Sequence, residues 1–222
     1  SAARLDEANL EGANLEGANL EGATLTSAQL TKANLSDASL LKVKAFEVNL
    51  HSANLSGVQL KGALLTRAQL SKCDLRGVSL KGVKIGGVSL NGAQLAGVHL
   101  SDLSLEGAQL KGARFEGATL ERCGLKGVDL SYASLKGATL VACELQGATL
   151  TSVELAEATL RGCDLSEATL EGCDLSEATL SEGLWEGVNL TQASLRKARA
   201  EGLHLSEANL TGADLREAQL SR

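Results

Sequence analysis

The sequence predicts an all-β protein whose chain winds into a solenoid of about eleven coils. Three observations predict it. Every residue whose number divides by five, from Leu5 to Leu220, is apolar, and 39 of these 44 positions are Leu. The residue two places before this centre is nearly always small, and Gly dominates two places after it. A weaker period of 20 residues groups the repeats in fours.

The five-residue period fits neither a regular helix nor a regular strand. On an α-helix five residues advance the chain by about 500°, so the Leu side chains would spread around the cylinder. On a strand five residues reverse the face at every repeat. Within one repeat the small residue and the Leu lie two apart, so they share a face of extended chain. The chain must then turn a corner, and Gly just before that corner suits the bend because it tolerates unusual backbone angles.

The 20-residue period predicts four repeats per coil, and hence a quadrilateral cross-section. Three sets of residues keep this spacing: Thr119, Thr139, Thr159 and Thr179; Cys123, Cys143 and Cys163; and Asn14, Asn34 and Asn54. Stacked coils place such residues about 4.8 Å apart, where ladders of hydroxyl and amide groups can form. Eleven coils give a rod roughly 53 Å long. We expect one solenoid domain over residues 1–222.

Composition narrows the function classes. Hydrophobic residues make up 44%, aromatic residues only 2%, and Pro and Met are absent, which predicts a narrow core of Leu, Ala and Val. A net charge of −6 argues against direct nucleic-acid binding. No apolar run approaches the roughly 20 residues of a membrane span, and no signal peptide is visible. A start at Ser1 without Met fits either a processed protein, such as one delivered to an organelle, or a segment excised from a longer chain.

The consensus A-[N/D/T/Q]-L-x-G resembles the pentapeptide-repeat family. Residues 8–12 and 213–215 illustrate it, and the resemblance covers essentially the whole chain. The resemblance implies a right-handed quadrilateral β-helix with the centre and small residues inside. It does not imply one function, because a fold can carry many.

The cysteines and histidines predict no catalytic, cofactor or metal site. All five cysteines occupy the small inward position: Cys73, Cys123, Cys143, Cys163 and Cys173. We expect buried, reduced thiols that act as small hydrophobic residues, because a column of parallel thiols does not converge on a metal. His51, His99 and His204 fall at outward positions on different coils, without partners for a catalytic triad. The chain is therefore not expected to be an enzyme.

Charge is banded along the rod. Residues 41–140 carry a net charge of +6, and residues 141–187 carry −9. We name the acids of the second stretch the acidic band: Glu144, Glu154, Glu157, Asp164, Glu167, Glu171, Asp174, Glu177, Glu182 and Glu186. Like charges stacked in one column repel each other. The band is either a solvated surface that keeps the rod soluble or a docking site for a basic partner.

The resemblance also raises an alternative function. Some members of the family, the quinolone-resistance proteins, resemble a DNA duplex in size and charge and bind DNA gyrase in its place. This chain differs from them because its centres are Leu rather than Phe, it has no projecting loops or C-terminal helical segment, and its middle is basic. A DNA-mimicking inhibitor or protector of gyrase is therefore the alternative hypothesis.

Departures from the repeat mark further candidate sites. Leu41 and Phe46 are apolar at outward positions, and Leu64 lies one coil on. These three residues either form an exposed apolar patch for a partner, or Phe46 simply covers the small centre Ala45. In residues 183–185 a large Trp centre stands beside a missing side chain, which predicts size compensation and turns Leu184 outward near the acidic band.

These observations together predict a rigid scaffold or spacer for protein–protein interaction, as an accessory subunit of a larger assembly. The partner's identity stays open. The sequence shows no polar cap at either end, so we expect the ends to be covered by flanking sequence, by a partner or by end-to-end self-association. The contacts that we expect to matter are the acidic band, the patch around Phe46, Leu184 and the two ends.

Overall fold

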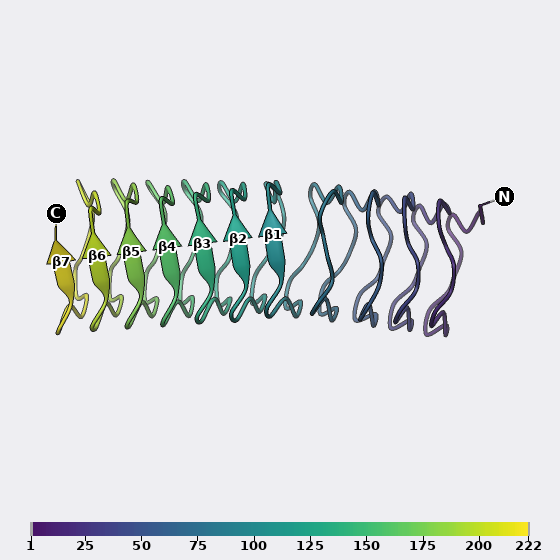
Figure 1. The fold of residues 1–222 in the computed structure, drawn as a ribbon, viewed down its shortest axis with the longest axis horizontal. Helices are drawn as coiled ribbons and strands as arrows, with labels where there is room; N and C mark the ends of the chain where they lie inside the picture. Colours follow the sequence, from purple (N-terminus) through teal and green to yellow (C-terminus); the bar gives the residue numbers. More distant parts are fainter. Residues whose placement is uncertain (1, 222) are drawn as a thin grey trace.

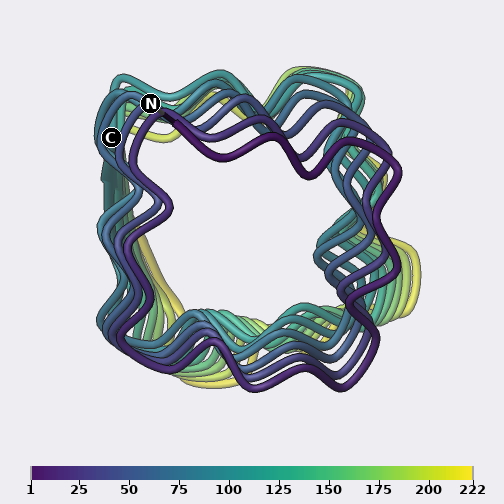
Figure 2. The same cartoon turned by 90° about the vertical axis from the view of Figure 1, so that its right-hand side faces the viewer.

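The computed structural model describes residues 2–221, and the terminal residues Ser1 and Arg222 lie outside the described part. The chain winds around one long axis with its two termini at opposite ends (Figure 1). Viewed along that axis, each coil is a square with four sides and four corners (Figure 2). The quadrilateral solenoid predicted from the sequence is therefore confirmed.

Seven three-residue strands form one parallel sheet along one side of the square. They are β1 (His99–Ser101), β2 (Thr119–Glu121), β3 (Thr139–Val141), β4 (Thr159–Arg161), β5 (Thr179–Ser181), β6 (Arg199–Glu201) and β7 (Gln219–Ser221). They lie in the order β1 to β7, and each residue pairs with the residue 20 places later, as Leu100 does with Leu120. The 20-residue period is thus the length of one coil.

The continuous strands make about six turns, which is fewer than the eleven coils predicted. The difference arises because the remaining coils are paired only through isolated bridges. These bridges keep the same 20-residue register and begin near the N-terminus with Arg4 and Thr24.

We name the four sides faces A, B, C and D. They contain residues 43–45, 48–50, 53–55 and 58–60 respectively, with their equivalents every 20 residues, and β1–β7 lie on face D. Isolated bridges run along face B from Asn9 to Asn209 and along face C from Asn14 to Asp214 without a break. Faces A and C lie on opposite sides of the square, since they are half a coil apart (Figure 2).

Each corner is a tight turn. The N–H of the small residue donates to the carbonyl of the centre three residues earlier, for example Ala13 to Leu10 at 3.0 Å. The residue two after the centre has a positive φ, such as 65° at Gly12 and 58° at Glu7. Positive φ at the third residue of a turn is what a type II turn requires, which explains the frequent Gly. This Gly lies inside the corner, and not just before it as the sequence suggested.

The interior is a column of Leu, Ala and Val side chains. The two largest fully buried side chains are those of Trp185 and Phe115, each 1% exposed. All five cysteines are free and buried, as predicted. Burial raises the pKa of the Cys73 and Cys173 thiols to about 12, so they behave as neutral small side chains.

Trp185 fits only because Gly183 has no side chain. A Cβ atom at Gly183 would lie 2.6 Å from Trp185 Nε1 and 3.1 Å from the carbonyl oxygen of Cys163. Real Cβ atoms do not approach other atoms as closely as the first distance, so one group would have to move. The size compensation predicted for residues 183–185 is confirmed.

Candidate functional site

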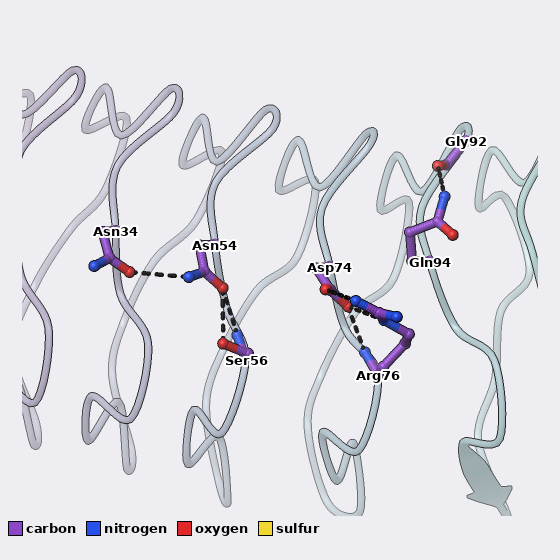
Figure 3. A network of polar contacts seen from close by, with 7 residues as sticks. All are labelled: Asn34, Asn54, Ser56, Asp74, Arg76, Gly92 and Gln94. Atoms are coloured by element: carbon purple, nitrogen blue, oxygen red, sulfur yellow. Dashed lines mark hydrogen bonds and ion pairs between the residues drawn. The ribbon is translucent and has the colours of Figure 1, made fainter.

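The outward middle residue of many repeats is an Asn or Asp that holds the next corner. On face C, Asn54 Oδ1 accepts the backbone N–H of Ser56 at 3.1 Å, and its amide donates to Asn34 at 3.1 Å (Figure 3). Asp74 one coil on accepts the backbone N–H of Arg76 at 3.1 Å in the same way, and it also accepts from the Arg76 side chain at 2.9 Å (Figure 3). Such side chains close a turn by binding the backbone two residues on. These polar groups therefore support the fold before any partner is considered.

The acidic band is divided between opposite sides of the rod. Glu144, Asp164, Glu167 and Glu186 lie on face A and at its corner with face B. Glu154, Asp174, Glu157 and Glu177 lie on face C and at its corner with face D. Glu171 and Glu182 occupy the two other corners. One flat partner surface cannot contact both sides at once.

The two sides differ in how far their charges are neutralised. Lys136 Nζ lies 3.4 Å from Glu157, and Lys197 Nζ lies 4.0 Å from Glu177. On the face A side, Glu144, Glu167 and Glu186 form no ion pair with any residue between 2 and 221. The face A side is therefore the better site for a basic partner.

Two carboxylates of the band have structural partners. Asp164 accepts the backbone N–H of Ser166 at 3.0 Å, and Asp174 accepts that of Ser176 at 2.9 Å. Partial burial opposes ionisation of Asp164, but hydrogen bonds from Ser166 and Gln146 outweigh it and hold the pKa of this carboxyl below its usual value. A variant that tests surface charge should leave both aspartates in place.

The turn-closing carboxylates whose pKa is lowered predict a loss of stability in acid. The hydrogen bonds from Ser131 lower the pKa of Asp129, and Arg76 lowers that of Asp74. Because the folded-state pKa lies below the unfolded value of about 4, the unfolded chain binds protons first as pH falls. We expect the free energy of unfolding to be constant between about pH 5 and about pH 8 and to fall progressively below about pH 4.

The control for this pH dependence is Asp129→Asn. Asn keeps the acceptor oxygen, as Asn189 shows by accepting the N–H of Thr191 at 3.0 Å, but it does not titrate. Chemical denaturation across the acid range should therefore give a shallower decline for the variant. An unchanged decline would show that Asp129 has the same pKa in the folded and unfolded states.

The apolar candidates do not all gather at one place. Phe46 is 39% exposed at the corner between faces A and B, while Leu64 is half-buried on face A and bridged to Lys44 and Lys84. Leu41 lies at the opposite corner of face A and lines a groove on face D. Leu184 is 50% exposed on face A beside its bridge partner Asp164, so it extends the less neutralised side of the acidic band.

This groove is the feature that the sequence reasoning missed. On face D, residues 77–82 form no ladder hydrogen bond with the coil before or after them. On the same face, Ser39 N–H donates to Ala18 at 2.9 Å, and Leu40 N–H donates to Gln59 at 2.9 Å. Pairing begins again between β1 and β2, and the coils next to β1 on its N-terminal side stand visibly further apart (Figure 1).

The coils separate where the inward position, which usually holds a small residue, holds a larger one. Val58, Val78 and Val98 stack directly on face D, where Ala38 and Ala118 stand on either side of them. On face A the bridge is also missing between Lys84 and Ser104, where Val83 and Leu103 stack. A narrow, close-packed interior does not accept extra methyl groups without moving the backbone. We attribute the separated coils to this overpacking, which three Val at 20-residue spacing would have signalled.

The groove has a volume of about 830 Å³, within the usual range of ligand clefts. A smaller hollow of about 340 Å³ continues it towards His99. The floor of the larger groove is apolar, and glycines occupy the corners at both of its ends. The lining residues are Leu41, Gly57, Val58, Gln59, Leu60, Lys61, Gly62, Gly77, Ser79, Lys81 and Gly82.

Between residues 2 and 221 no group of three or more His, Cys, Asp or Glu side chains is arranged to hold a metal ion. No helix in this part of the chain has the length and apolar character needed to cross a membrane.

The fold defines this chain as a repeat solenoid with parallel 20-residue coils. The chain belongs to the pentapeptide-repeat family, because the pentapeptide repeats profile matches it in eight copies. The matched segments are residues 3–40, 46–82, 89–127, 108–143, 143–182 and 185–222.

Several similar solved structures come from the same family. HetL, a pentapeptide repeat protein involved in heterocyst differentiation regulation in Nostoc sp. strain PCC 7120, is 30% identical, with 95% of this chain and 88% of HetL covered and a TM-score of 0.43. A trypsin-treated variant of QnrB1, a plasmid-mediated fluoroquinolone resistance protein, is 19% identical over 89% of each chain, with a TM-score of 0.39. Rfr23 from the cyanobacterium Cyanothece 51142 is 24% identical, with 60% of this chain and 90% of Rfr23 covered and a TM-score of 0.25. No curated protein sequence matches significantly.

Proposed function

We propose that this protein is a non-catalytic rigid scaffold or spacer that positions protein partners as an accessory subunit of a larger assembly. The observation that carries the proposal is the continuous bridging along faces B and C. Because successive coils are paired along these two faces, groups on the surface keep fixed spacings over most of the rod. A repeat solenoid of this kind offers an extended binding surface in place of one deep site.

The face A side of the acidic band is the first surface that we assign to a partner. Glu144, Glu167 and Glu186 have no ion-pair partner in the described chain, and the exposed Leu184 adds an apolar contact. Complementary charge steers association, while buried apolar contacts supply affinity. A basic protein surface with an apolar centre would fit this side.

Two variants of equal charge change test this assignment. One carries Glu144→Lys, Glu167→Lys and Glu186→Lys on the face A side, and the other carries Glu154→Lys, Glu157→Lys and Glu177→Lys on the face C side. Both keep Asp164 and Asp174, which hold corners. We expect the protein that co-purifies with the wild type to be lost with the first variant and retained with the second. A complex that resists both variants would contradict the assignment, and a wild-type protein that forms no complex in its native cells would contradict the scaffold function.

A DNA-mimicking action on gyrase is the second candidate. The division of the acidic band supports it, since carboxylates on two opposite sides of a rod have the arrangement of two rows of phosphates. The net charge of +6 over residues 41–140 opposes it. A gyrase supercoiling assay with titrated protein separates the two candidates. Inhibition that both charge-reversed variants lose would favour mimicry, whereas no inhibition at micromolar protein would eliminate it.

A further inference from the structure

The groove on face D leaves backbone groups without partners. The N–H groups of Leu60, Ser79 and Leu80 donate to no backbone carbonyl, and the carbonyls of Val58 and Ser79 accept from no backbone N–H. Elsewhere on this face the equivalent groups are paired from coil to coil, as between β1 and β2. Unpaired strand edges of this kind are templates for another extended chain. The solenoid wall therefore contains two free edges in its middle.

We propose that this groove binds an extended acidic peptide segment of a protein partner, which pairs through its backbone with residues 57–62 and 77–82. The inference rests on the proposed scaffold function and names the docking place of one partner. Addition of a strand to a free edge is an established way of binding peptides, in which backbone hydrogen bonds supply affinity and side-chain pockets supply specificity. Because each side of the square is only three residues wide, about three residues of the peptide would pair.

The lining of the groove favours an extended chain. Leu41, Val58 and Leu60 give it an apolar floor, on which small apolar side chains can rest. Gly57 and Gly77 at one corner, with Gly62 and Gly82 at the other, carry no side chains over the groove. At these four glycines a peptide backbone can therefore approach the strand edges from outside without displacing a side chain.

The charge of the groove identifies the partner as acidic. Lys61 and Lys81 stand at the same corner, one coil apart, and both are exposed. Neither forms an ion pair with a residue in the described part of the chain, whereas Lys42 on the preceding coil lies 3.9 Å from Glu21. Carboxylates at one end of a bound peptide would meet these two ammonium groups. The surrounding stretch, residues 41–140, has the only large positive net charge in the sequence.

The test uses a fluorescein-labelled peptide, Glu-Glu-Thr-Val-Thr-Val, and the full-length protein. Fluorescence anisotropy should show saturable binding, weakened at least tenfold by Lys61→Glu with Lys81→Glu. The matched control is Lys72→Glu with Lys126→Glu, which changes the net charge equally at exposed corners away from the groove and should leave binding unchanged. A peptide with N-methylated Val residues should bind at least tenfold more weakly, since it cannot pair.

The opposite results would overturn the proposal. Equal binding to the Lys61/Lys81 variant and to the control variant would show attraction by net charge only. Equal binding of the N-methylated peptide would exclude strand pairing, and no binding at 1 mM peptide would exclude the site. If the partner of the acidic band still co-purifies in that case, the scaffold function stands and only the groove assignment fails.

Discussion

The Gly183→Ala variant is expected to be less stable than the wild type by about 1–3 kcal/mol, the usual range for inserting a methyl group into a filled core. The added Cβ would lie 2.6 Å from Trp185 Nε1, inside a core where Trp185 is 1% exposed. The neighbouring carbonyl of Cys163 cannot yield freely, because it accepts the backbone N–H of Leu184 at 3.0 Å. Urea denaturation followed by circular dichroism measures the difference.

A double variant tests whether the size of the Trp185 side chain causes this loss of stability. Trp185→Leu restores the usual centre but leaves a cavity beside Gly183, so it should cost part of the 3–5 kcal/mol typical of a Trp→Ala substitution. Gly183→Ala with Trp185→Leu recreates the common Ala-x-Leu repeat and should be more stable than either single variant. Additive effects in this double-mutant cycle would contradict the compensation.

A second glycine serves as the control for the effect that a Gly→Ala substitution has on the backbone entropy of the unfolded chain. Gly124 has an ordinary φ, and its Cβ position lies 3.7 Å from the nearest atom, the Cα of Ser104. Gly124→Ala should therefore be neutral or slightly stabilising, since it restricts the unfolded chain without a clash.

Amide hydrogen exchange should be rapid at three positions in the middle of the rod. The N–H groups of Leu60, Ser79 and Leu80 have no backbone acceptor, so we expect exchange close to the rate of an unstructured peptide. Ser39 and Leu40 on the same face are hydrogen-bonded at 2.9 Å and should be protected. Protection of the first three at the level of the second two would contradict the open groove.

If overpacking separates the coils, then replacing the inward Val residues on face D with Ala should close the groove. In a variant with Val58→Ala, Val78→Ala and Val98→Ala, the inward position on face D would match its neighbours Ala38 and Ala118. The coils should then pair, and exchange at Ser79 and Leu80 should slow at least tenfold, which corresponds to about 1.4 kcal/mol of added protection. The control variant Val48→Ala, Val88→Ala and Val128→Ala removes the same groups from face B and should keep rapid exchange, because Val58, Val78 and Val98 still stack on face D.

The sequence predicted the architecture because the repeat constrains almost every residue. One apolar residue in five and a small residue two places earlier decide what lies inside, and this pattern alone placed Trp185 beside the missing side chain of Gly183. The division of the acidic band was also present in the numbering, since Glu144 and Glu154 are ten residues, or half a coil, apart.

The groove was harder to predict, because no single repeat contains its cause. Val occupies the inward position elsewhere without harm, as Val48 and Val128 do on face B, where bridging continues. The coils separate only where large inward residues stack on successive coils, as Val58, Val78 and Val98 do, so the effect depends on contacts between residues 20 apart. The positive φ at non-glycine corners such as Glu7 follows in the same way from the coil, which determines the conformation whatever residue is present.

The square coil separates two properties of the rod, which are its length and the direction in which its side chains point. A deletion of 20 residues removes one coil and leaves every later side chain on its original face, so it shortens the rod by one coil. A deletion of five residues removes one side of the square, so everything beyond it rotates by a quarter turn about the axis with almost no loss of length. Distance between two bound partners and the angle between them are therefore encoded independently, in steps of twenty residues and of five.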